Sequence, residues 1–193
     1  SLMKNRYIII LLSLLINLNF FYSAFSDEFN FDVTELQVAE NGNILRGIKG
    51  GEVTTRNNEI IITADNFEYN KLTMLLKAEG NVKLRDVIAN VLIESNKIFY
   101  SKNKEEIYTK GKSKAVNGPN IIINADEYFK YNRLTSVLEA KGNVKLEDTS
   151  KEITIYTNEI TYLKNEEKIY TLGETNINIE DKYNIKGSDL TLL

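Results

Sequence analysis

The segment "YNKLTMLLKAEGNVKLRD" (residues 69–86) recurs almost unchanged as "YNRLTSVLEAKGNVKLED" (residues 131–148), 62 residues further along the chain. Weaker copies lie at half that distance. Four tyrosines and four glycines keep this 31-residue interval: Tyr69, Tyr100, Tyr131 and Tyr162, and Gly80, Gly111, Gly142 and Gly173. An internal repeat of this kind indicates one supersecondary unit that stacks on its neighbours. The stronger similarity at 62 residues indicates that odd and even units differ in kind.

Within a unit, apolar side chains alternate with polar ones. The apolar positions are Met74, Leu76, Ala78, Val82 and Leu84 in the first copy and Leu138, Ala140, Val144 and Leu146 in the third, with weaker versions at Ile107, Ile169 and Ile177. Charged residues stand between most of them. This period of two is typical of an antiparallel strand with one buried face.

Each unit opens with a shorter apolar run, such as "EIIITADNFEY" (residues 59–69), whose apolar parity changes near Asp65. We interpret that change as a bulge or corner. Because glycine weakens a strand interior, we also expect sharp bends at the four repeated glycines, Gly80, Gly111, Gly142 and Gly173. Each unit is therefore predicted to be one strand–turn–strand element.

The predicted fold is all-β. Two strands per unit over the 167 residues that follow position 26 give roughly eleven antiparallel strands in a sandwich or jelly-roll. A β-helix or solenoid is the alternative fold, but its strands are usually parallel and its rungs shorter. The alternation of two kinds of unit favours two facing sheets.

The N-terminal residues predict export. Residues 1–2 precede Met3 and are interpreted as an expression remnant. Residues 3–26 combine Lys4 and Arg6, an apolar stretch and a small-residue pattern, which is typical of a secretory signal peptide. A retained membrane anchor is the alternative. In both cases residues 27–193 are expected to form one exported domain.

Composition excludes several kinds of chemistry. The chain has no cysteine and no histidine, which removes disulfides, thiolate nucleophiles, histidine bases and the usual zinc ligands. The 24 basic residues and 27 acidic residues are interspersed, so nucleic-acid binding is not expected. The acids Asp65, Asp86, Asp126 and Asp148 recur with the repeat, as residues of turns and solvated corners do. We therefore expect no catalytic residue, no metal and no cofactor.

The motifs "ITADNFEYNK" (residues 62–71) and "LKAEGNVKLRD" (residues 76–86), with their copies, resemble the OstA/LptA-like jelly-roll family of lipopolysaccharide transport. The resemblance covers about residues 29–193. Within the family, residues 29–47 and the end of the chain look most like the N-terminal periplasmic domain of LptD. Residues 183–193 begin another unit, so we expect a fragment that precedes a transmembrane barrel. A complete LptA-like bridge protein is the alternative.

The resemblance implies a non-enzymatic role in the periplasm, in association with the outer membrane. The alternating apolar residues would form a groove between two sheets that shields the acyl chains of lipopolysaccharide, and they would also serve as core. The implied partners are lipopolysaccharide, other jelly-roll proteins of the transport system through edge-strand pairing, and the barrel with its plug lipoprotein if the chain is from LptD. A non-lipid structural repeat is the other alternative.

Overall fold

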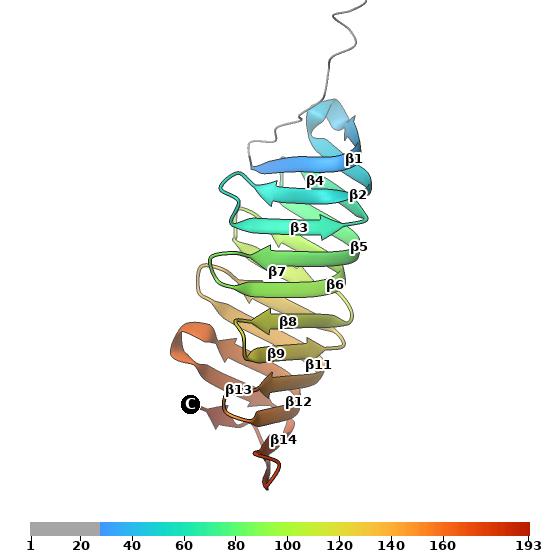
Figure 1. Cartoon of the computed structure of the whole chain (residues 1–193). Coiled ribbons are helices and arrows are strands. Elements are labelled where there is room, and N and C mark those ends of the chain that lie inside the picture. The colour runs from blue at the N-terminus through green and yellow to red at the C-terminus, as the bar shows by residue number, and fades with distance from the viewer. Residues whose placement is uncertain (1–27) are drawn as a thin grey trace, which may run out of the picture.

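Antiparallel strands make up most of the chain. The structure, a computed structural model, describes residues 28–193. Every strand pair in this part is antiparallel, so the all-β, jelly-roll-like fold predicted from the repeats is confirmed (Figure 1). The predicted expression remnant and signal peptide lie outside the described residues.

The described residues form more strands than the roughly eleven expected. The strands are β1 (Phe29–Ala39), β2 (Ile44–Thr55), β3 (Ile60–Ala64), β4 (Asn66–Asn70), β5 (Leu75–Asp86), β6 (Val91–Ser101), β7 (Glu106–Thr109), β8 (Ser113–Asn117), β9 (Ile121–Ala125), β10 (Tyr128–Asn132), β11 (Val137–Asp148), β12 (Ile153–Leu163), β13 (Lys168–Leu172), β14 (Glu174–Ile179), β15 (Tyr183–Ser188) and β16 (Thr191–Leu192). Two short 3₁₀ helices, η1 (Glu40–Gly42) and η2 (Lys164–Glu166), lie between them. The expected number was low because each hairpin is bent in the middle, and at several of these bends one predicted strand is divided into two shorter strands, as β3 and β4 are.

Folding each hairpin in half produces two facing layers. The second half of β5 (residues 83–86) pairs with β3, whereas its first half (residues 75–79) pairs with β4. We call the layer that contains β3, β8, β9, β14 and β15 the front layer, and the layer that contains β4, β7, β10, β13 and β16 the back layer (Figure 1). The long strands β1, β2, β5, β6, β11 and β12 contribute one half to each layer.

The layers meet along one side at the corners of the bent strands. Hairpin turns line the other side, which we call the mouth. The front lip comprises the turns at residues 56–59, 87–90, 118–120 and 149–152, and the back lip comprises those at residues 71–74, 102–105, 133–136 and 164–167.

The corners of the odd units explain the repeated Gly-Asn pair. Gly80 has φ +83° and Asn81 has φ +48°, both in the left-handed region that glycine adopts readily and asparagine tolerates. The pairing of β5 with β6 shifts register at this point. Asn81 Nδ2 then donates a hydrogen bond to Asp65 Oδ2 at 2.9 Å. Asn143 and Asp126 repeat the contact beside Gly142.

The corners of the even units use buried hydroxyl groups instead. Ser113 Oγ donates to Thr109 Oγ1 at 2.7 Å near Gly111, and Thr175 Oγ1 donates to Thr171 Oγ1 at 2.8 Å near Gly173. All four hydroxyl side chains are buried. The stronger repeat at 62 residues therefore reflects two kinds of corner that alternate along the stack.

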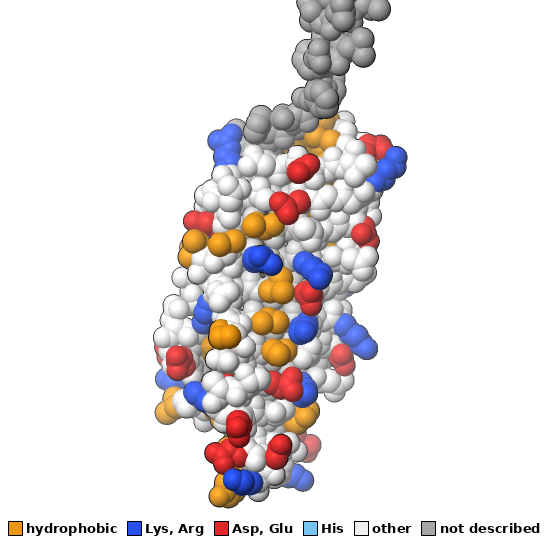
Figure 2. Space-filling model, in the orientation of Figure 1, with side chains coloured by type: hydrophobic (Ala, Val, Ile, Leu, Met, Phe, Trp, Pro, Cys, Tyr) orange, Lys and Arg blue, Asp and Glu red, His pale blue; other side chains and the backbone are white. Residues whose placement is uncertain are grey.

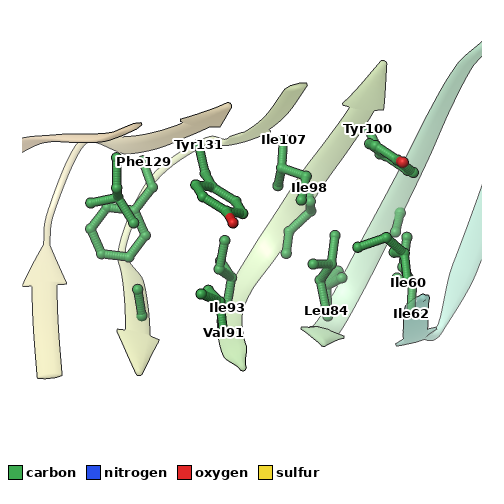
Figure 3. Packing of buried hydrophobic residues seen from close by; sticks show 14 of the residues in the cluster. Ile60, Ile62, Leu84, Val91, Ile93, Ile98, Tyr100, Ile107, Phe129 and Tyr131 are labelled. Carbon is green, nitrogen blue, oxygen red and sulfur yellow. The ribbon is translucent and has the colours of Figure 1, made fainter. Parts of the chain in front are cut away.

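The core fills the space between the layers. Figure 3 shows Tyr100, Ile107 and Tyr131 of the back layer opposite Leu84, Val91 and Ile93 of the front layer. On the outer face of the front layer, acidic, basic and apolar side chains are interspersed (Figure 2). Lys83, for example, pairs with Glu94 there at 3.2 Å. Each layer thus has one apolar face, and the two apolar faces meet.

Alanine at Gly80 tests the close approach at the corner. A Cβ at Gly80 would lie 2.8 Å from Asp65 Cβ, whereas a Cβ at Gly111 would meet nothing within 4 Å. Both residues have positive φ, +83° and +86°, so both alanines carry the same backbone strain. We expect Gly80→Ala to lower the free energy of unfolding by about 1–3 kcal/mol more than Gly111→Ala. Equal losses in denaturant titration would contradict a steric role for Asp65.

Candidate functional site

Most of the predicted groove residues lie in the interior. Leu76, Ala78, Ile107, Leu138 and Ala140 project from the back layer, and Val82, Leu84, Val144, Leu146 and Ile177 project from the front layer. Each of these ten is at most 6% exposed. Because the two faces pack against each other, the interior is filled in this structure and the predicted groove is closed.

Two predicted groove residues lie at the margin of this interior. Met74 precedes β5 in a turn, with φ +54°, and is half-buried. The alternation in the sequence runs on to Met74, but the strand itself begins at Leu75, so Met74 does not extend the inward face. Ile169 lies on β13 near the end of the stack and packs against the core while half-buried.

The repeated acids, which the sequence assigned to turns and solvated corners, are of two kinds. Asp65 and Asp126 are exposed at corners. Asp86 and Asp148 are buried at the front lip, 1% and 9% exposed. Each caps its own turn: Asp86 Oδ1 accepts from Ala89 N at 2.9 Å, and Asp148 Oδ1 accepts from Ser150 N at 2.9 Å. Asp86 and Asp148 thus belong to turns, as expected from the sequence, but they are buried because these strand ends face inward.

Arg133 of the back lip reaches across the mouth to the front lip. Its Nε donates to Asp86 Oδ2 at 2.7 Å, and its Nη2 donates to Glu59 Oε2 at 3.1 Å. Its Nη1 donates to Glu105 on its own lip. The Arg133 side chain is 13% exposed and that of Asp86 is 2% exposed. We call Arg133, Asp86, Glu59 and Glu105 the clasp.

Other side chains support the clasp. Tyr100 Oη donates to Glu105 Oε2 at 2.8 Å, and Lys102 Nζ donates to the same carboxylate. Lys164 Nζ of the back lip donates to the carbonyl oxygen of Ala89 on the front lip. A second charged side chain therefore spans the mouth one repeat away from Arg133.

The sequence pattern predicted only turns here and missed the clasp. Lys71, Lys102, Arg133 and Lys164 recur at the 31-residue interval, each two residues after the repeated tyrosine. The signal in the sequence was the recurrence of basic residues in the back-lip turns and of acidic residues at the front lip. It was not recognised because Arg133 and Asp86 are 47 residues apart in the chain, and only the folded stack brings the two lips together.

Two groups of the clasp, Arg133 and Glu105, have pKa values shifted in favour of their charged forms. Burial alone lowers the pKa of Arg133, but hydrogen bonds to Asp86 and Glu59 outweigh it and hold that pKa above its usual value. For the acid Glu105 the directions are reversed. Burial raises its pKa, but hydrogen bonds from Lys102, Tyr100 and Arg133 outweigh burial and hold that pKa below its usual value. Both side chains therefore carry full charge at neutral pH.

A small cavity lies between the layers close to the mouth. It has a volume of about 10 Å³ and is lined by Val91, Ala115, Asn117, Ile123, Tyr131, Ser136, Leu138, Tyr162 and Lys164. The Tyr131 hydroxyl is buried, has no hydrogen-bond partner among residues 28–193 and points toward the front layer (Figure 3). Burial raises the pKa of Tyr131 to about 12. The interior is therefore imperfectly filled at this point.

Larger hollows lie on the outer surface. Two at the corners measure about 980 and 470 Å³ and are lined largely by polar and charged side chains, such as Asn143 and Asn81. Two others, of about 490 and 330 Å³, lie beside Phe99 of the back layer and Thr149 of the front lip. Among residues 28–193, no group of three or more acidic side chains is arranged to hold a metal ion, and no helix is long and apolar enough to cross a membrane. The candidate binding site is the mouth and interior, where the two apolar faces meet and charged side chains cross between the lips.

In comparisons with known proteins, no family model matches the chain and no curated protein matches it in sequence.

Replacing Arg133 tests whether the clasp stabilises the fold. Arg133→Gln leaves the buried Asp86 carboxylate without its cation, and removing one partner of a buried pair costs about 3–5 kcal/mol. We expect the free energy of unfolding in urea to fall by that amount. The matched control is Arg46→Gln, whose pair with Glu68 has side chains 44% and 45% exposed, and it should cost under about 1 kcal/mol.

The partner of Arg133 is tested by adding Asp86→Asn to Arg133→Gln. This second change removes the unpaired charge, so the double variant should recover part of the lost stability. A double variant that is less stable than Arg133→Gln would contradict the pairing of Arg133 with Asp86.

Proposed function

We propose that this chain is a lipid-carrying domain of lipopolysaccharide transport, which acts without catalysis by holding acyl chains between its two layers. The observation that carries the proposal is the continuous apolar interior. Buried aliphatic and aromatic side chains follow one another from Phe29 to Ile177 through every repeat, on both facing layers. An acyl chain that enters needs no specific polar partner, because burial is favourable by about 0.8 kcal/mol per methylene.

Exposed apolar side chains on the lips support entry from the mouth. Leu72 and Leu134 on the back lip are 75% and 74% exposed, and Ile88 on the front lip is 74% exposed. Val87 beside it is 48% exposed. Other exposed apolar side chains, such as Val38 and Leu172, lie away from the lips and need no explanation. The support from these four rests on their place on the turns that flank the mouth. These side chains would offer an incoming chain an apolar contact before it enters the interior.

The free energy gained by burying an acyl chain is large enough to offset the loss of the clasp. A chain of roughly ten methylenes gains about 8 kcal/mol when it leaves water. This exceeds the roughly 3–5 kcal/mol at stake in a buried ion pair such as the clasp. Contacts between the facing layers would be replaced by contacts with the acyl chain, so the apolar side chains stay out of water in both states.

The family resemblance supports a narrower proposal. The chain would be the N-terminal periplasmic domain of LptD, at the outer membrane after export, and a complete LptA-like bridge protein is the alternative. Its proposed partners are lipid A acyl chains, neighbouring jelly-rolls that pair with its edge strands, and, for LptD, the barrel with its plug lipoprotein. The interspersed surface charge gives no support for nucleic acid as a partner.

A structural repeat domain that binds no lipid is the second candidate. The closed interior favours it, because Leu76, Leu84 and Ile93 are each at most 1% exposed and already form a well-packed core. The two candidates differ in one property: whether the interior admits an acyl chain while the domain stays folded.

Photo-crosslinking separates the two candidates. A photoreactive side chain at Leu76 of β5 or Leu138 of β11 faces the interior, and Lys83 and Lys145 are matched outward positions on the same strands. In cells that make lipopolysaccharide, we expect lipopolysaccharide adducts at the inward positions, detected by immunoblot after irradiation, and none at the outward ones. Folded protein without inward adducts, or equal labelling of both faces, would contradict lipid carriage.

A further inference from the structure

The two lips are continuous along the stack. On the back lip, Lys102 N donates to Met74 O at 3.0 Å and Arg133 N donates to Glu105 O at 2.9 Å. On the front lip, Val87 N donates to Glu59 O at 2.8 Å and Gly118 N donates to Asn90 O at 2.9 Å. Because each backbone bond joins turns of the same lip, each lip can move as one body.

Side chains make the polar contacts that we find across the mouth. Arg133 binds Asp86 and Glu59, Lys164 binds the Ala89 carbonyl, and Asn117 Nδ2 donates to Tyr162 Oη at 3.3 Å. Strand pairing, by contrast, runs within each layer and around the corners. Separation of the lips, with the glycine corners as hinge, would therefore break these side-chain contacts and disturb apolar packing near the mouth, but it would leave the strand ladders intact.

Both sides of the clasp keep partners when it is released. Arg133 Nη1 is bound to Glu105 on its own lip, and Tyr100 Oη lies 3.4 Å from the same nitrogen. Asp86 Oδ1 continues to accept from Ala89 N, and its Oδ2 becomes accessible to water at an open mouth. Release would be very costly if it left Arg133 or Asp86 buried without a partner. Because Arg133 keeps Glu105 and Asp86 gains water at an open mouth, neither charge is left in that state.

We propose that the clasp is a releasable lock on the mouth: Arg133 ties the back lip to the front lip, and the mouth opens when Arg133 leaves Asp86 and Glu59. The identity of the ligand that enters the interior rests on the proposed function, whereas closure of the mouth by Arg133 does not depend on any ligand. Arg133 is thus a gating residue for the interior and does not contact an acyl chain in the closed state.

Distances between spin labels across the mouth test the lock. The chain has no native cysteine, so labels at Ile88→Cys and Leu134→Cys report only the separation of the front and back lips. Both positions are highly exposed and tolerate a label. A second pair, Leu72→Cys with Leu134→Cys, lies within the back lip and serves as the reference for a folded stack.

In pulsed electron paramagnetic resonance without lipid, we expect Arg133→Gln to add a longer-distance population to the cross-mouth pair. The within-lip pair should keep its parent distribution, and the surface control Arg46→Gln should change neither pair. An unchanged cross-mouth distribution in folded Arg133→Gln would overturn the lock.

If Arg133→Gln broadens the within-lip pair as well, the protein has lost its fold and Arg133→Lys decides instead. Lysine keeps one charge but lacks the fork that reaches several carboxylates at once, so we expect a smaller cross-mouth lengthening. A parent-like distribution in Arg133→Lys, or its unfolding, would overturn the lock. Opening without lipopolysaccharide adducts at Leu138 would overturn the proposed function and leave the lock standing.

Discussion

The fold depends on one constraint: each layer has a single apolar face, and the other layer is the surface available to cover it. On the outer face in Figure 2, charges of both signs are dispersed among other polar and scattered apolar side chains, so the hydrophobic effect favours one arrangement, in which strands bend and place their two halves face to face. Gly80 and its repeats permit the bend, and the Asn81–Asp65 contact fixes it. The 31-residue unit is the length of chain needed to cross both layers and return.

Much of this fold could be predicted from the sequence, because alternation and glycine spacing are local signals. Inward residues such as Leu76 and Leu146, and a corner near Asp65, follow from the period of two and its change of parity. Burial of Asp86 could not be predicted, because an acid at a strand end is usually solvated. Its burial depends on Arg133, which only the stacking of repeats brings near. The candidate site was thus predictable on its apolar side and missed on its polar side.

The mouth and the interior are held together by different kinds of interaction. Apolar packing holds the interior without directional bonds, so its occupants are exchangeable in principle. The clasp is directional and charged, and its hydrogen bonds are strong because the site is sheltered from water. A lipid carrier needs both properties: an interior that accepts chains of variable length, and a polar closure that keeps the interior from collecting other apolar molecules. A purely structural domain needs only the first.

Hydrogen–deuterium exchange with and without lipopolysaccharide tests the central claim most directly. If acyl chains enter through the mouth, the bound lipid should change exchange at lip amides such as Val87 and Arg133. Amides at the corner, such as Asp65, whose N–H donates to Gly80 O at 2.9 Å, should keep their protection. Lipid that leaves lip exchange unchanged, or that alters the outer faces while the lips stay as they were, would contradict this account.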